Sequence, residues 1–73
     1  SMNGWANWET WNASLWIQND EMLYRVARLN RHFGYDALVA VLEDLTGAAT
    51  PDGCRWDDPA IDRDEMNEML DEL

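Results

Sequence analysis

The sequence predicts a mainly helical fold: one compact small domain, residues 1–73, with three to four helices and a Pro/Gly/Asp-rich loop before the last helix. Three observations predict it. Apolar residues recur at helical spacing along much of the chain. Asn and Asp stand where several of these stretches begin, as helix N-caps do. The chain has 73 residues, 47% of them hydrophobic, which suits one small core rather than a disordered tail.

The first helix is expected over residues 8–18, with Asn7 as its N-cap. Trp8, Trp11 and Leu15 recur at i, i+3 and i+7, so we predict that they form the buried face. The chain holds five tryptophans. Because each buried Trp removes roughly 150–250 Å² of surface from water, they can supply a core that so short a chain otherwise lacks.

The second helix is expected over residues 20–33, where Asn19-Asp20 offers an N-cap and Gly34 follows the end. Its buried face is predicted from a stripe at i, i+4, i+7 and i+11, which Leu23 and Ala27 widen: Met22, Val26, Leu29 and Phe33. Basic residues occupy the other side or the last turns, where they suit the helix dipole: Arg25, Arg28, Arg31 and His32.

The third helix is expected over residues 37–46, with Asp36 as its N-cap and Gly47 after its end. Its residues are apolar nearly all round, which predicts a central helix buried on most sides. Two β-branched residues, Val39 and Val41, leave a strand as the alternative.

Residues 47–60 are expected to form a loop. The stretch Thr-Pro-Asp-Gly at 50–53 is typical of a turn, and Pro59 interrupts regular structure again. Between these signals, residues 54–56 are interpreted as a short extended piece. Trp5 and Trp56 lie outside the expected helices, and we interpret both as residues at the edge of the core.

The last helix carries the strongest signals. Asp62 as N-cap with Glu65 three residues later forms a capping-box pattern, and Ile61 with Met66 forms a hydrophobic staple. One side of this helix is apolar and is expected to face the core: Met66, Met69, Leu70 and Leu73. The opposite face is acidic and carries Asp64, Glu68, Asp71 and Glu72.

The charge is distributed unevenly. The net charge is −10, yet residues 1–35 hold three acidic and three basic residues, so the whole excess lies in residues 36–73. This balance argues against direct binding of nucleic acid or of anionic membranes, because both need Lys and Arg. An asymmetry on this scale indicates either an interaction surface or a simple contribution to solubility.

The sequence offers little for catalysis. One Cys excludes an intrachain disulfide, and a Cys54–His32 pair has no local support, so we expect a protein that is not an enzyme. No metal site and no cofactor are expected, because an EF-hand pattern and a glycine-rich phosphate loop are absent. No apolar run spans a bilayer and no secretory signal is visible, which predicts a cytoplasmic protein. Ser1 is interpreted as a cloning remnant.

Residues 7–12, Asn-Trp-Glu-Thr-Trp-Asn, resemble the opening of a family of small proteins encoded by phages and mobile elements. Members of that family also carry a Thr-Pro-Asp-Gly…Trp…Asp-Pro stretch and an acidic last helix, found here as residues 50–53, Trp56 and Asp58-Pro59. The resemblance covers most of the chain and implies a phage or prophage origin and a bacterial host cell. It implies no catalytic residues, since the family is largely of unknown function.

In size, charge and origin the chain is also similar to anti-CRISPR and anti-restriction proteins. We therefore predict a phage-type inhibitor that mimics DNA and occupies a basic protein surface of a host nucleic-acid-targeting defence complex. Helix neighbours lie about 5–6 Å apart, and long side chains can splay to the wider spacing of phosphates along a DNA strand. The predicted binding residues are Asp57, Asp58, Asp64, Glu68, Asp71 and Glu72.

The alternative is a small helical protein-interaction module of unknown partner. It would bind through Trp5, Trp56 or the Met-bearing side of the last helix, because Trp and Met suit adaptable contacts. Binding through acidic residues weakens as salt rises, whereas binding through apolar residues is nearly insensitive to salt. The sequence leaves the oligomeric state open.

Overall fold

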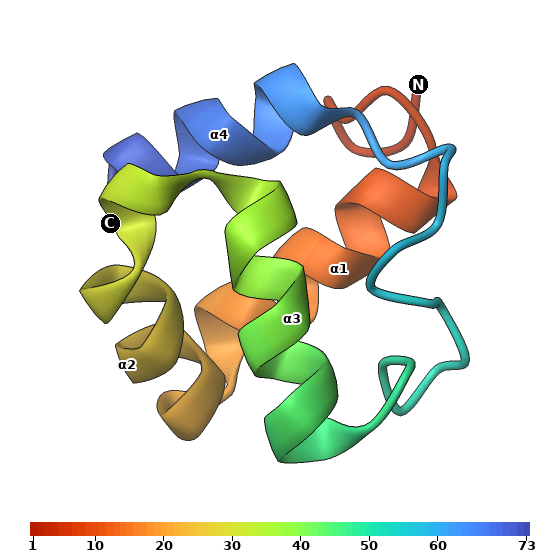
Figure 1. The fold of residues 1–73 in the computed structure, drawn as a ribbon. Coiled ribbons are helices and arrows are strands. Elements are labelled where there is room, and N and C mark those ends of the chain that lie inside the picture. Colours follow the sequence, from red (N-terminus) through yellow and green to blue (C-terminus); the bar gives the residue numbers. More distant parts are fainter.

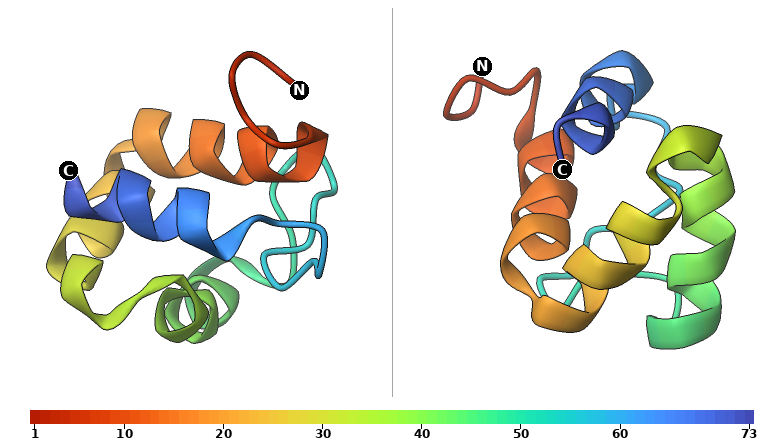
Figure 2. Two further views of the ribbon diagram at one scale, coloured as in Figure 1. Left: turned by 90° about the horizontal axis from the view of Figure 1, so that it is seen from above. Right: turned by 90° about the vertical axis from the view of Figure 1, so that its left-hand side faces the viewer.

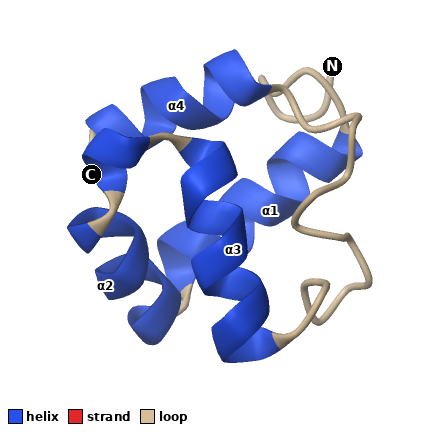
Figure 3. Ribbon diagram, viewed as in Figure 1, coloured by secondary structure: helices blue, strands red, loops and turns tan.

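The computed structural model describes residues 1–73 and contains helices joined by short connections and one long loop (Figures 1 and 3). The elements are α1 (Trp8–Asn19), α2 (Glu21–Leu29), the 3₁₀ helix η1 (Arg31–Phe33), α3 (Tyr35–Thr46) and α4 (Arg63–Asp71). Strand pairing is limited to two isolated bridges, Met2 with Trp5 and Ala49 with Arg55. The predicted helical fold class is confirmed, and the strand alternative for residues 37–46 is wrong.

The helices enclose one core. Helices α1 and α4 lie side by side, and α3 crosses them, seen nearly end-on in the left view of Figure 2. Helix α2 packs against α1 at one edge of the molecule, and η1 leads from α2 to α3. The loop of residues 47–62 runs along the opposite edge and joins α3 to α4 (Figure 1).

Trp56 lies in the core rather than at its edge. Its side chain is 0% exposed, and its indole Nε1 donates to Thr46 Oγ1 at 3.1 Å. The Tyr35 hydroxyl donates to the Trp56 carbonyl oxygen at 2.7 Å. The loop thus contributes the largest fully buried side chain of the molecule. The predictions that Trp56 caps the core edge and is available to a partner are therefore wrong.

Helix α1 has the expected bounds and the expected N-cap, since Asn7 accepts from the Thr10 amide at 2.9 Å. Its buried face, however, differs from the prediction. Trp8 is 39% exposed, and Trp11 and Leu15 are only partly buried. The buried residues are mostly small or polar: Thr10, Asn12, Ala13, Ser14 and Ile17. The loop supplies hydrogen-bond partners on this side, which is why polar side chains can be buried there.

Helix α2 turns only one edge of its predicted apolar side to the core. It ends at Leu29, earlier than predicted, and its buried residues are Leu23 and Ala27. Of the stripe residues predicted to be buried, Val26 is partly buried and packs against the core. The other three are exposed: Leu29 at 80%, Phe33 at 72% and Met22 at 48%. Because α2 lies at the edge of the molecule, only one narrow side of the helix finds a neighbour in the chain.

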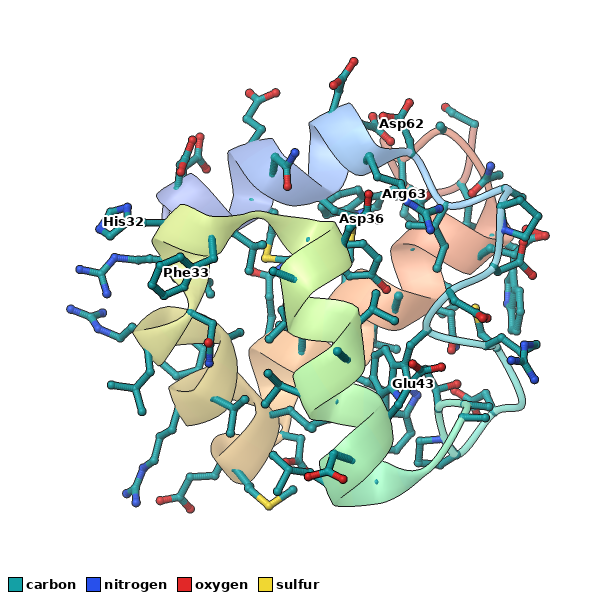
Figure 4. The ribbon with its side chains drawn as sticks, in the orientation of Figure 1. His32, Phe33, Asp36, Glu43, Asp62 and Arg63 are labelled. Atoms are coloured by element: carbon teal, nitrogen blue, oxygen red, sulfur yellow. The ribbon has the colours of Figure 1, made fainter.

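Helix α3 begins before the predicted position. Its N-cap is Gly34, with a φ of 86° that suits glycine, and Tyr35 is its first residue. Asp36 therefore lies in the first turn and is not the cap; instead it pairs with Arg63 at 3.1 Å (Figure 4). Leu38, Leu42 and their buried neighbours occupy one side, whereas Ala37, Ala40 and Leu45 are exposed. The helix is thus buried on one side, not nearly all round.

Helix α4 follows the prediction most closely. Asp62 accepts from the Glu65 amide at 3.0 Å, and Met66, Met69 and Leu70 are buried. Only half of the capping box forms, because the Glu65 carboxylate accepts from the Ala6 amide at 2.8 Å. Since the methionines of α4 are buried, the prediction that its Met-bearing side contacts a partner is wrong.

Candidate functional site

Four carboxylates cover the outward side of α4, and we call them the acidic face: Asp64, Glu68, Asp71 and Glu72. All four are exposed. At 3.6 residues per turn they lie within about 100° of one another around the helix axis, and at 1.5 Å per residue they extend over about 12 Å. Figure 4 shows oxygen-tipped side chains projecting outward along α4. The structure thus brings these four predicted site residues together on one rigid element.

The acidic face has no partner inside the molecule. The three ion pairs of the protein involve other carboxylates: Glu21 with Arg25, Asp57 with Arg55, and Asp36 with Arg63. None of the four side chains accepts a hydrogen bond from another residue: Asp64, Glu68, Asp71 and Glu72. The charge on this face is therefore free to act on another molecule.

The other two predicted site residues are engaged locally. Asp57 accepts from Arg55 Nε at 2.9 Å, and this hydrogen bond holds the pKa of Asp57 below its usual range. Asp58 accepts from the Ala60 amide at 2.8 Å, and so stabilises the turn before α4. Both lie in the loop, so the structure joins four of the six predicted residues on α4 and holds the other two in a separate segment.

A groove runs beside the acidic face, between α4 and the N-terminal segment. Its volume is about 400 Å³, and its lining residues are Gly4, Trp5, Gln18, Glu65, Glu68, Met69, Glu72 and Leu73. Three glutamates and no basic residue line it, while Met69, Leu73 and the indole of Trp5 give it an apolar part. Trp5, predicted as an aromatic contact, therefore lies next to the acidic face.

Sequence reasoning missed a hydrogen-bonded network that joins two of the motifs. Asn12 donates from Nδ2 to Asp52 Oδ2 at 2.8 Å and accepts from the Thr50 hydroxyl at 2.7 Å. Trp16 Nε1 also donates to Asp52 Oδ2, at 2.7 Å. These bonds, from Asn12 first and Trp16 second, lower the pKa of Asp52. The Thr-Pro-Asp-Gly turn is thereby attached to α1.

A second set of bonds attaches the start of α1 to the start of α4. The Thr10 hydroxyl donates to Asn7 Oδ1 at 2.6 Å and accepts from the Asp62 amide at 2.9 Å. Asn7 Nδ2 donates to the Ala60 carbonyl at 2.6 Å. The polar residues of the 7–12 motif therefore hold the fold together. A signal for this was visible in the sequence: the 7–12 motif contains polar residues, Asn7, Thr10 and Asn12, at the start of the helix and within it.

The nucleophilic and imidazole side chains lie in unrelated places. Cys54 is buried, and burial raises the pKa of its thiol to about 11. His32 lies exposed in η1, at the outer edge of the molecule (Figure 4). Neither residue lines the groove beside α4. No three His, Cys, Asp or Glu side chains converge in a way that could hold a metal ion.

Fold and site together define a small four-helix domain that displays a free acidic helix face. The whole chain, residues 1–73, matches a protein family, DUF7249, described as a family of unknown function. The protein belongs to this family. No curated protein and no solved structure matches the chain significantly. None of its helices has the length and apolar character needed to cross a membrane.

Proposed function

We propose that this protein is a phage-type inhibitor that binds, through its acidic face, a basic surface of a bacterial nucleic-acid-targeting defence complex. It acts by binding rather than by catalysis, and it occupies a surface that DNA or RNA otherwise fills. The observation that carries the proposal is the row of four carboxylates on α4 without any internal partner: Asp64, Glu68, Asp71 and Glu72.

The spacing of the charges supports mimicry of a nucleic-acid strand. Four carboxylates over about 12 Å of the α4 axis give one charge per about 4 Å of axis, and each strand of B-DNA carries one phosphate per about 3.4 Å of the duplex axis. A cleft lined by Lys and Arg attracts such a row at long range and accelerates association. Measured along the axis, the row is therefore about as long as the section of duplex that carries four phosphates of one strand.

The placement of the charges also favours a role outside the fold. Asp71 and Glu72 lie at the C-terminal end of α4, where negative charge opposes the helix dipole and costs a few tenths of a kcal/mol or more each. Neither makes a bond that offsets this cost. A cationic partner that binds at that end of the helix neutralises the unfavourable interaction between these carboxylates and the helix dipole. Removal of this cost then contributes to the free energy of association.

The adjacent groove extends the surface that a basic partner can contact. An Arg or Lys side chain of the partner can lie along the partly buried Leu73 with its charge at Glu68 and Glu72. Trp5 lines the same groove, and an indole attracts a cation over its ring. The alternative of an aromatic and Met-based module retains only Trp5, because Trp56, Met66 and Met69 are buried.

The test is capture of partners from a lysate of the bacterial host, at low and at high salt, followed by mass spectrometry. The bait is the wild-type chain and the triple variant Glu68→Lys, Asp71→Lys, Glu72→Lys. We expect a nucleic-acid-binding complex that elutes as salt rises and that the triple variant fails to retain. Duplex DNA should compete with the wild-type chain for this complex.

The matched control reverses three acids elsewhere that also have no ion-pair partner: Glu9, Glu43 and Asp44. Each triple variant changes the net charge from −10 to −4, so a general effect of charge acts on both equally. If the target is retained as strongly by the α4 variant as by the control variant, the acidic face is not the binding surface and the proposal fails.

A further inference from the structure

Helix α2 and η1 expose a row of apolar side chains, which we call the α2 stripe: Met22, Val26, Leu29 and Phe33. Leu29 and Phe33 are largely exposed, at 80% and 72%, and Met22 is about half exposed, at 48%. Val26 is partly buried, with part of its side chain against the core. A groove of about 390 Å³ runs along the helix and is lined by Met22, Val26 and Leu29 among others. Apolar residues that form a contiguous exposed row commonly mark a contact with another molecule.

The charge of the side chains changes from negative to positive along the segment formed by α2 and η1. Its N-terminal end carries Asp20 and Glu21, and the other end carries Arg28, Arg31 and His32. None of these three cations has an acidic partner within the molecule. Arg25, between the two ends, pairs with Glu21 at 2.8 Å. The surface is thus apolar along one row, acidic at one end and basic at the other.

We propose that the α2 stripe binds a second copy of this chain, with the two α2 helices antiparallel. In antiparallel packing the same flank of each helix faces its counterpart in reverse order. Glu21 of each copy then faces Arg28 of the other copy, which gives two such pairs. Met22 of each copy contacts Leu29 and Phe33 of the other. Parallel packing would instead bring the two acidic ends together and the two basic ends together. The opposed helix dipoles favour the antiparallel arrangement as well.

The charge balance of the chain favours a second copy at this place. Residues 1–35 have no net charge, whereas the whole chain carries −10. Two equal acidic molecules therefore repel each other least when they approach through α2. An anionic membrane surface repels the rest of the molecule. It also cannot form the two reciprocal Glu21–Arg28 pairs that a second copy of the chain provides. Figure 1 places α2 and α4 on different edges, so the dimer leaves both acidic faces uncovered.

The expected dimer is weak. One short helix covers less than the about 800 Å² per partner that is typical of stable complexes, so we expect half-dimerisation at roughly 10–100 µM. Sedimentation equilibrium over a range of protein concentrations measures this directly. Leu29→Glu places a charge in the row and should raise the dissociation constant at least about tenfold.

A charge exchange tests the antiparallel register. Glu21→Arg and Arg28→Glu should each weaken the dimer about three- to tenfold, and the double variant should return to within about twofold of the wild-type value. The control is Leu45→Glu on α3, where Leu45 is also exposed, at 50%; it should leave the dissociation constant unchanged. Circular dichroism confirms that every variant stays folded.

Three outcomes overturn the proposal. The wild-type chain remains monomeric at the highest concentration, Leu29→Glu and Leu45→Glu behave alike, or the double variant fails to restore dimerisation. A parallel experiment sediments the chain with vesicles of phosphatidylserine and phosphatidylcholine. If a monomeric chain binds these vesicles through Leu29, the stripe is a lipid-binding surface and not a dimer contact.

Discussion

Helices α1 and α2 are neighbours in the sequence, yet α1 buries polar side chains and α2 exposes apolar ones. Helix α1 buries Thr10, Asn12 and Ser14, whereas α2 exposes Leu29 at 80% and Met22 at 48%. Polarity alone predicts the reverse for both. The difference shows that the contacts available to a side chain decide its burial in so small a domain.

The physical reason lies in the loop of residues 47–62. It lies against α1 and brings Thr50 and Asp52 to the side chain of Asn12. No buried side-chain nitrogen or oxygen in the protein lacks a hydrogen-bond partner, so these polar groups are buried without the penalty of an unsatisfied group. The loop makes no side-chain hydrogen bond to α2, and Met22 and Leu29 on its outward side stay exposed.

Asn12→Ala should have the largest effect of the predictions that test this comparison. The substitution removes one partly buried hydrogen bond, to the carboxylate of Asp52, and one buried hydrogen bond, which leaves the Thr50 hydroxyl without its acceptor. We expect a loss of about 2–3 kcal/mol in the free energy of unfolding. Urea denaturation followed by tryptophan fluorescence measures it.

The matched control is Asn19→Ala at the other end of α1. Asn19 is exposed, and its side chain bonds only to the Leu15 carbonyl of its own helix. It should cost less than about 0.5 kcal/mol. Equal losses for the two variants would show that the buried polar side of α1 contributes nothing special to stability.

The dependence of stability on acid pH tests whether the hydrogen bonds between α1 and Asp52 stabilise the fold. Hydrogen bonds from Asn12 and Trp16 lower the pKa of Asp52 below its ordinary 3.8, so the unfolded chain takes up this proton more readily than the folded one. The stabilisation is therefore complete above that ordinary value and is lost as the pH falls through the lowered one. Between about pH 5 and about pH 3, the urea midpoint of the wild-type chain should fall relative to that of Asp52→Asn.

Asp71→Asn is the control for this experiment, since Asp71 belongs to the acidic face and has no internal hydrogen bond. The difference between the urea midpoints of Asp71→Asn and the wild-type chain should not increase in favour of the variant as the pH falls. If Asp52→Asn and Asp71→Asn follow the same course, the bonds to Asp52 do not contribute to stability.

Leu29→Gln should have the smallest effect. The side chain is largely exposed and contacts no part of the core, so the free energy of unfolding of the monomer should change by less than about 0.5 kcal/mol. The measurement is made at a protein concentration well below that of dimerisation. A loss comparable to that of Asn12→Ala would mean that the stripe packs within the monomer.

The signals that sequence reasoning used correctly are local ones. Asn7 and Asp62 cap their helices as predicted, because a cap depends on residues only three positions away. The apolar side of α4 and its four exposed acids also follow from spacing within one helix. Trp56 was misplaced because its burial depends on where the loop runs, and no periodic pattern extends through a loop.

By itself, therefore, the sequence determined the helical class, the bounds of α1 to within a residue, the turn at residues 50–53 and the acidic side of α4. Only the tertiary structure decided which sides of α1 and α2 face inward and that Trp56 fills the core. It also decided that no arginine from elsewhere in the chain pairs with the acidic face. The reason is that helix formation and capping depend on near neighbours in the chain, whereas burial and hydrogen bonding depend on residues such as Asp52 that are distant in sequence from α1.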